Sequence, residues 1–135
     1  MKAGSGILHC ATLLLLERCH GAQVEAGWWT DLRTGKSTRT GFDGVHKVNI
    51  GEKLMLIVSE VAEAMEGHRK DLMDDKLPHW KMLDVELADA VIRIFDLAGG
   101  LNIDLAGALV EKMEFNAGRA DHKIESRVLP GGKAY

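Results

Sequence analysis

The 135-residue chain has only two cysteines, Cys10 and Cys19, in a stretch whose apolar spacing predicts a helix. On a continuous helix their separation corresponds to roughly 13 Å, which is too far for a disulfide. Free thiols are typical of a reducing compartment, where disulfides are rare. We therefore expect two free, buried cysteines and a cytoplasmic protein.

The chain also lacks a long hydrophobic run and a strong excess of either charge. The apolar stretch over residues 7–16 is interrupted by His9 and Thr12, so it falls short of the about 20 residues that a transmembrane helix needs. A clear signal-peptide cleavage site is missing as well. The formal net charge of −3 gives no support for a surface that binds polymeric nucleic acid. We therefore expect neither a membrane nor a nucleic-acid partner, and an anionic ligand must be held locally.

Hydrophobic residues recur at helical spacing in four segments, which predicts an all-α fold in a single domain over residues 1–135. The expected helices cover residues 5–20, 49–68, 81–98 and 104–122, and the core of the domain covers about 49–123. The second helix carries an apolar stripe at helical spacing: Leu54, Ile57, Val58, Val61 and Met65. The expected N-caps are Ser5, Asn49 (with Glu52 three residues later) and Asp104, and the expected stops are Gly21 and Gly99-Gly100.

Two segments do not follow the helical pattern. Residues 21–48 form a glycine-rich insert in which Trp28 to Leu32, followed by Thr34-Gly35-Lys36, predicts a short hairpin. Adjacent Trp28 and Trp29 argue against full disorder of this insert. The tail over residues 124–135 holds Pro130-Gly131-Gly132 and is expected to be irregular.

Two acidic pairs stand out on the second and third helices. Glu60 and Glu63 form one pair, and Glu86 and Asp89 form the other. A spacing of three residues places both carboxylates of a pair on one helix face. Four carboxylates on apolar helices are costly to bury unless cations neutralise them, and oxygen ligands suit Mg²⁺ or Mn²⁺. The alternative is a solvated polar face without a metal.

Basic residues follow on the fourth helix. Lys112, Asn116 and Arg119 lie within about 60° of one another on a helical wheel, and Lys123 extends the same stripe. Such a stripe could hold the phosphates of a polyphosphate whose metal ions are bound by the acidic pairs. The alternative is again a solvated helix face.

Together these motifs resemble those of the MazG-like all-α nucleoside triphosphate pyrophosphohydrolases. Ser59-Glu60-Val61-Ala62-Glu63 and Val85-Glu86-Leu87-Ala88-Asp89 resemble the ExxE…ExxD signature, and residues 111–119 resemble the K-x-x-x-N-x-x-R helix of that family. The resemblance covers residues 49–123. It implies hydrolysis of a nucleoside or deoxynucleoside triphosphate to the monophosphate and pyrophosphate. It also implies a helical bundle that is completed by oligomerisation, as a homodimer or homotetramer.

The resemblance also implies roles for individual residues. Two or more Mg²⁺ or Mn²⁺ ions would be bound by Glu60, Glu63, Glu86 and Asp89, and Glu63 and Glu86 would be the catalytic acids. Lys112, Asn116 and Arg119 would contact the phosphates. Lys53 lies seven residues before Glu60, on the same helix face, and could also reach a phosphate. Ser59 stands where the family often has a second glutamate, which leaves the identity of the general base open.

The insert resembles that of the phage MazZ-type branch, which implies purine deoxynucleotides as substrates, dGTP first and then dATP, and the host cytoplasm as location. Trp28 and Trp29 could stack on the base, although both rings could instead anchor the insert. His79 could also touch the substrate.

Three alternatives remain open. Within the family, dUTP, dCTP or phosphoribosyl-ATP could be the substrate. A di-iron carboxylate bundle normally needs Glu-x-x-His pairs, and neither acidic pair ends in histidine. A helical interaction module without catalysis would have dispensable acids.

Overall fold

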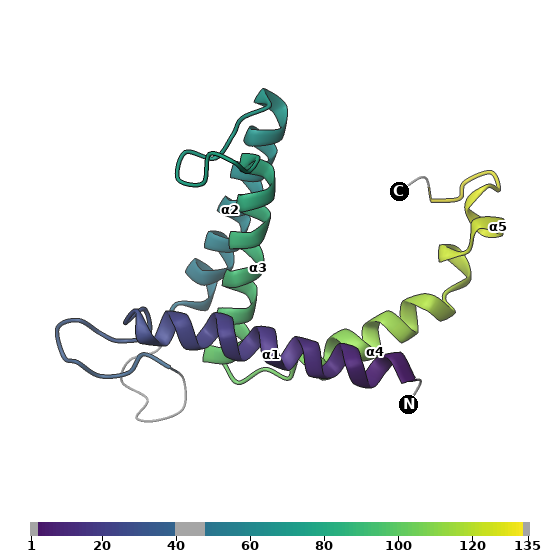
Figure 1. The fold of residues 1–135 in the computed structure, drawn as a ribbon. Helices are drawn as coiled ribbons and strands as arrows, with labels where there is room; N and C mark the ends of the chain where they lie inside the picture. The colour runs from purple at the N-terminus through teal and green to yellow at the C-terminus, as the bar shows by residue number, and fades with distance from the viewer. Residues whose placement is uncertain (1–2, 40–47, 134–135) are drawn as a thin grey trace. The chain divides into compact units, whose positions relative to one another are not determined.

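The computed structural model describes residues 3–39 and 48–133, and in these residues the chain is all-α, as the sequence predicts. The predictions for residues 40–47 of the insert and for the last two residues of the tail lie outside this part. The helices are α1 (Ala3–Glu25), α2 (Ile50–Lys70), α3 (Met82–Gly100), α4 (Leu105–Gly118) and the short α5 (Ile124–Arg127), with a 3₁₀ turn over Ala120–His122 before α5 (Figure 1). Two compact units divide the chain, one of residues 3–13 and 104–133 and the other of residues 14–39 and 48–103.

Helix α1 is longer at both ends than the sequence predicts. It begins at Ala3, so Ser5 is not its N-cap, and it continues through Gly21 to Glu25. Ser5 instead donates a hydrogen bond from Oγ to Glu114 Oε1 on α4, at 2.6 Å. A buried hydroxyl that is satisfied by a side chain of another helix joins α1 to α4 within their unit. Cys10 and Cys19 are both free, as expected, but neither is buried: Cys10 is exposed and Cys19 is half-buried.

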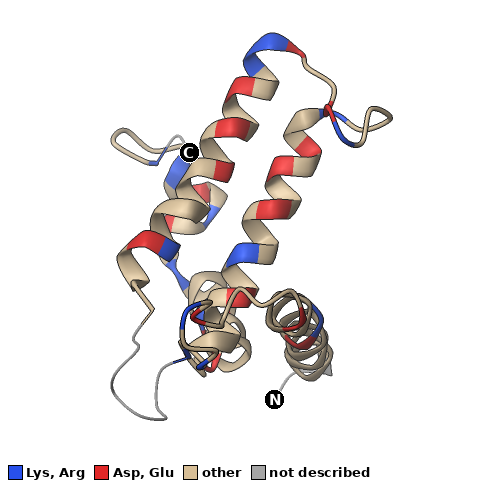
Figure 2. Cartoon of the chain, turned by 90° about the vertical axis from the view of Figure 1, so that its left-hand side faces the viewer, with Lys and Arg blue, Asp and Glu red and all other residues tan. Residues whose placement is uncertain are grey.

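Helices α2 and α3 form an antiparallel pair that runs side by side over most of their length (Figures 1 and 2). The Asn49 side chain accepts a hydrogen bond from the Glu52 backbone N–H at 3.1 Å, which confirms the predicted cap of α2. The two helices pack tightly near their connecting loop, where a Cβ added to Gly67 would lie 2.8 Å from Met82 Cβ. This pairing brings the two acidic pairs of the sequence onto neighbouring helices.

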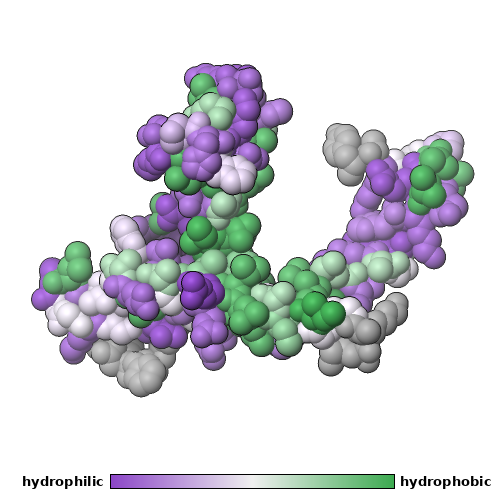
Figure 3. Space-filling view, viewed as in Figure 1, coloured by the Kyte–Doolittle hydropathy of each residue, from purple (hydrophilic) through white to green (hydrophobic). Residues whose placement is uncertain are grey.

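The apolar stripe that the sequence predicts on α2 is largely uncovered in the single chain. Four of its five side chains are exposed, and only Ile57 is half-buried. Helix α3 also has exposed apolar side chains at helical spacing, and apolar surface is visible on the α2–α3 pair (Figure 3). Helical spacing marks an apolar face but does not say what covers it. The exposed apolar residues concerned are Leu54, Val58, Val61 and Met65 on α2, and Leu87, Val91 and Ile94 on α3.

The visible part of the insert folds into a compact turn. The predicted hairpin is reduced to one antiparallel bridge between Thr30 and Ser37, and the described residues form no strand. The Asp31 N–H donates to the Lys36 carbonyl at 2.8 Å. Gly35 has a φ of +67°, which residues other than glycine rarely adopt. The turn presents Trp28 and Trp29 in different environments, as described below.

Helix α4 is shorter than predicted. Asp104 caps it as expected, because its side chain accepts from the Gly107 N–H at 2.8 Å. The helix ends at Gly118 rather than near His122, and Arg119 has extended backbone angles. The tail is less irregular than expected, since residues 124–127 form α5. Among the described residues, no helix combines the length and apolarity that a membrane crossing requires.

Candidate functional site

Three of the four predicted metal ligands come together between α2 and α3. Glu60, Glu63 and Glu86 each offer a carboxylate oxygen, and these oxygens lie within 4.8 Å of one another. Glu60 and Glu86 are buried, whereas Glu63 is exposed. Acidic residues lie in successive bands along both helices in Figure 2. Asp89 is half-buried one turn from Glu86, and it lies outside this group of three but close enough for its charge to act on Glu86.

The crowding of these carboxylates changes the acidity of Glu86. Burial is the largest cause, followed by a hydrogen bond with Glu60 and by the negative charges of Glu63, Glu60 and Asp89, and together they raise the pKa of Glu86 from 4.5 to about 7. The folded protein therefore favours the protonated form of Glu86 more than an ordinary glutamate would. A carboxylate kept partly protonated by its neighbours is a group whose charge a cation would restore.

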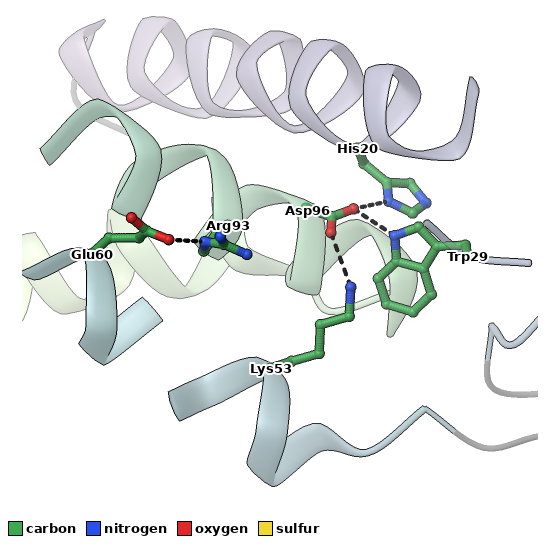
Figure 4. A network of polar contacts seen from close by, with 6 residues as sticks. All are labelled: His20, Trp29, Lys53, Glu60, Arg93 and Asp96. Carbon is green, nitrogen blue, oxygen red and sulfur yellow. Dashed lines mark hydrogen bonds and ion pairs between the residues drawn. The ribbon is translucent and has the colours of Figure 1, made fainter. Parts of the chain in front are cut away.

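A cation from the chain already contacts the cluster. Arg93 on α3 donates from Nε to Glu60 Oε1 at 2.5 Å, and the arginine side chain is about two-fifths exposed (Figure 4). This pair joins α2 to α3, and Arg93 lies one turn beyond Asp89 on α3. It uses one oxygen of Glu60, and a carboxylate has two, so the other oxygen can still serve as a ligand.

A second polar centre surrounds Asp96, further along α3. Its Oδ1 accepts from Trp29 Nε1 at 2.6 Å and lies 2.9 Å from His20 Nδ1, while its Oδ2 lies 3.6 Å from Lys53 Nζ (Figure 4). Lys53 Nζ also lies 4.5 Å from the centre of the Trp29 ring. Asp96 thus holds α1, the insert and α2 against α3. The predicted phosphate ligand Lys53 is an ion-pair partner in this centre.

The two tryptophans of the insert have different surroundings. Trp29 is 2% exposed and packs edge-on against His20 with the ring centres 5.4 Å apart, whereas Trp28 is 69% exposed. A Cβ added to Gly100 would overlap the Trp29 ring, and one added to Gly99 would meet His20. The two glycines therefore allow close packing at the end of α3. They do not stop the helix after residue 98 as predicted, because both belong to α3 and its C-cap is Leu101. Trp29 anchors the insert, which leaves Trp28 as the ring that is open to a base.

The predicted phosphate ligands of the other unit gather around Phe115. Lys112 Nζ lies 5.0 Å from the centre of that ring, and Arg119 Cζ lies 6.0 Å from it. Arg119 follows the end of α4, so the helical-wheel argument does not apply to it. Its side chain nevertheless lies near the same ring as Lys112. Asn116 Oδ1 is buried and has no hydrogen-bond partner among the residues that the structure describes.

Arg119 already has an anionic partner. Its Nε and Nη2 donate to the two oxygens of Asp121, at 2.9 and 2.6 Å. Lys133 Nζ lies 2.9 Å from the same carboxylate. Hydrogen bonds from Arg119 and Lys133 hold the pKa of Asp121 well below its usual range. A phosphate that binds Arg119 would have to compete with Asp121.

His79 lies apart from both polar centres. It is exposed in the loop between α2 and α3, and its ring centre is 5.8 Å from that of Trp80. It belongs to neither the acidic group nor the Asp96 centre, and the structure gives no contact that would support a role in substrate binding.

Sequence reasoning missed the centre around Asp96. Glu86, Asp89, Arg93 and Asp96 form a polar stripe on an otherwise apolar helix, and this stripe was the available signal. It indicates that Asp96 faces a polar partner but does not identify His20 or Trp29, which are 76 and 67 residues away.

Comparison of the chain with models of protein families, with curated proteins and with solved structures found no match. The MazG-like resemblance therefore stays a prediction, and it rests on the spacing of the acidic and basic residues.

Proposed function

We propose that the protein hydrolyses a deoxynucleoside triphosphate, with the help of Mg²⁺ or Mn²⁺, to the monophosphate and pyrophosphate. The observation that carries this proposal is the group of Glu60, Glu63 and Glu86, in which two of the three carboxylates are buried. Buried carboxylates without enough cations are destabilising. Within residues 3–39 and 48–133, Arg93 is the cation paired with this group, through Glu60.

The chemistry of the group fits a hard divalent ion. All donors are carboxylate oxygens, and Mg²⁺ binds oxygen ligands at about 2.0–2.1 Å. Ligands on opposite sides of one ion are then about 4.2 Å apart, so oxygens within 4.8 Å need only small side-chain movements. Such ions would stabilise charge on the attacked phosphate and activate a water. Glu60, Glu63, Glu86 and Asp89 would hold them.

The exposed apolar stripes of α2 and α3 support an oligomer. Seven large apolar side chains at helical spacing on one pair of helices are unusual on a monomer surface. A homodimer or homotetramer would cover them. The same stripes also favour the alternative function, a helical interaction module without catalysis, and the activity of acid-to-amide variants separates the two.

The first test is a panel of dNTPs with Mg²⁺ or Mn²⁺, in which the products are resolved by anion exchange. We expect monophosphate and pyrophosphate in equal amounts, with dGTP and dATP favoured over dCTP and dUTP. Activity should disappear with EDTA and return when Mg²⁺ or Mn²⁺ is added, because the acidic group supplies ligands but no positive charge. Full turnover in metal-free buffer, or diphosphate plus phosphate as products, would contradict the proposal.

A second test concerns Arg119 and its partner Asp121. Because Asp121 occupies the guanidinium, Asp121→Asn should free Arg119 and tighten triphosphate binding severalfold, whereas Arg119→Ala and Lys112→Ala should weaken it. Calorimetric titration of each variant with a non-hydrolysable dNTP analogue and with the dNMP measures the change in affinity for the two ligands. The change in affinity should be larger for the triphosphate analogue. Equal effects on both ligands would place Lys112 and Arg119 on a solvated face.

A further inference from the structure

A small cavity lies beside the Asp96 centre, within the unit that contains α2 and α3. Its volume is about 200 Å³, and its walls include Trp28, Lys53, Arg93 and Asp96, with Leu56 and Ile92 supplying apolar surface. Pockets for whole drug-sized ligands usually occupy about 300–1,000 Å³. This cavity is therefore suited to one planar ring system rather than to a complete nucleotide.

The walls offer an aromatic face and a polar edge. Trp28 is exposed although it lies on the wall of a cavity, and an exposed indole is a stacking surface for a heterocycle. Asp96 supplies the polar edge. A carboxylate has about four acceptor positions, and Trp29, His20 and Lys53 occupy three of them. One position of a buried carboxylate is left for a donor from a ligand, next to the ammonium group of Lys53, which is itself a donor.

Arg93 connects this cavity to the acidic group. The arginine lines the cavity and donates to Glu60. On α2, Lys53 and Glu60 are seven residues apart, which is about 10 Å along the helix. A ribose with two phosphates spans a comparable length. A molecule with its ring in the cavity could therefore place its phosphates at Glu60, Glu63 and Glu86.

We propose that this cavity is the nucleobase subsite, in which the base stacks on Trp28 and the Lys53–Asp96 pair contacts its donor–acceptor edge. This inference rests on the proposed function, because it assigns the base of the same substrate. It moves Lys53 from the phosphates to the base. Trp28 sets the size preference, since a purine covers more of an indole than a pyrimidine does. The Lys53–Asp96 pair matches one acceptor beside one donor, a pattern that several bases present.

The experiment measures base binding without hydrolysis. Deoxyguanosine, dGMP and dCMP are titrated calorimetrically into the metal-free full-length protein, with deoxyribose 5-phosphate as the ligand that lacks a base. We expect dGMP to bind more tightly than dCMP, and deoxyribose 5-phosphate to bind at least tenfold more weakly than dGMP. Trp28→Ala should weaken dGMP binding about tenfold, and Trp28→Phe should retain most of the parent affinity. Trp80→Ala, which removes another half-exposed tryptophan, is the matched control and should change nothing.

Lys53→Met tests the polar edge. If Lys53 contacts the base, this variant weakens the binding of deoxyguanosine and of a non-hydrolysable dGTP analogue by the same factor. A loss that grows with the number of phosphates would overturn the role of Lys53. Unchanged dGMP binding in a folded Trp28→Ala protein, or deoxyribose 5-phosphate binding as tightly as dGMP, would overturn the subsite even if dNTP hydrolysis is found. Base binding that follows this pattern would support the subsite even if hydrolysis is not found.

Discussion

Replacing Glu86 with Gln is expected to lower dNTP turnover by about two orders of magnitude or more, and Glu63→Gln should do the same. Each change removes one carboxylate ligand from a group of three that lies within 4.8 Å. Loss of a ligand weakens the bound ion and removes stabilisation of charge at the attacked phosphate. Initial rates at saturating Mg²⁺ and Mn²⁺ measure the effect. Asp84→Asn is the matched control, because Asp84 is exposed on the same helix and loses the same charge.

The Glu86→Gln variant should be more stable than the parent protein in the absence of metal, and the difference should depend on pH. In the folded state the pKa of Glu86 is raised from 4.5 to about 7, so folding favours its protonated form. The parent protein has no penalty below pH 4.5 and loses stability as the pH rises through 7. At pH 8 the penalty that Gln removes is on the order of 3 kcal/mol. Melting temperatures with EDTA should therefore match at pH 4.5 and diverge at pH 8.

Two results would contradict this view of the acidic group. A lower melting temperature of Glu86→Gln at pH 8, combined with retained activity, would show that the carboxylate has a structural role. Equal activity of the Glu63→Gln and Asp84→Asn variants would show that the group holds no catalytic ion.

Replacing Asp96 with Ala should have the largest effect on stability, with a loss of about 3–5 kcal/mol in the free energy of unfolding. The change leaves the ammonium of Lys53, the ring of His20 and the indole N–H of Trp29 without their partner in a buried site. Urea denaturation monitored by circular dichroism measures the loss. Asp96→Asn should cost less, because the amide oxygen still accepts from Trp29. Asp84→Ala should change stability by less than about 1 kcal/mol.

Gly100→Ala tests the same centre from the side of Trp29. A methyl group at this position would overlap the indole, so a loss of about 1–3 kcal/mol from overpacking is expected despite the better helix propensity of alanine.

An Asp96→Ala protein as stable as the parent would mean that the insert is not anchored at Trp29.

Local signals in the sequence were sufficient for part of the fold. Asn49 and Asp104 cap their helices as predicted, because a cap depends only on residues within one turn. Glu60 and Glu63 share a helix face for the same reason. Glu86 joins them because α2 and the next helix, α3, pair as antiparallel neighbours across the loop of residues 71–81.

The remaining features depend on contacts that periodicity does not describe. Helical spacing identifies the stripe of Leu54, Val58 and Val61, which is exposed in the single chain, but it does not say whether another helix or a second copy of the chain covers an apolar face. Arg119 was placed on α4, although the chain leaves the helix after Gly118. Because the helix ends there, Arg119 can pair with Asp121, which is only two residues later.

The contacts of Asp96 also set an order in which parts of the chain can form. Its bonds to His20 and Trp29 close loops of 76 and 67 residues, whereas the Arg93–Glu60 pair closes one of 33 within consecutive helices. Longer loops lose more chain entropy when they close, and nearby contacts generally form faster. The α2–α3 hairpin, with its acidic group, can therefore assemble first during folding. The N-terminal helix and the tryptophan turn then dock onto a surface that already exists.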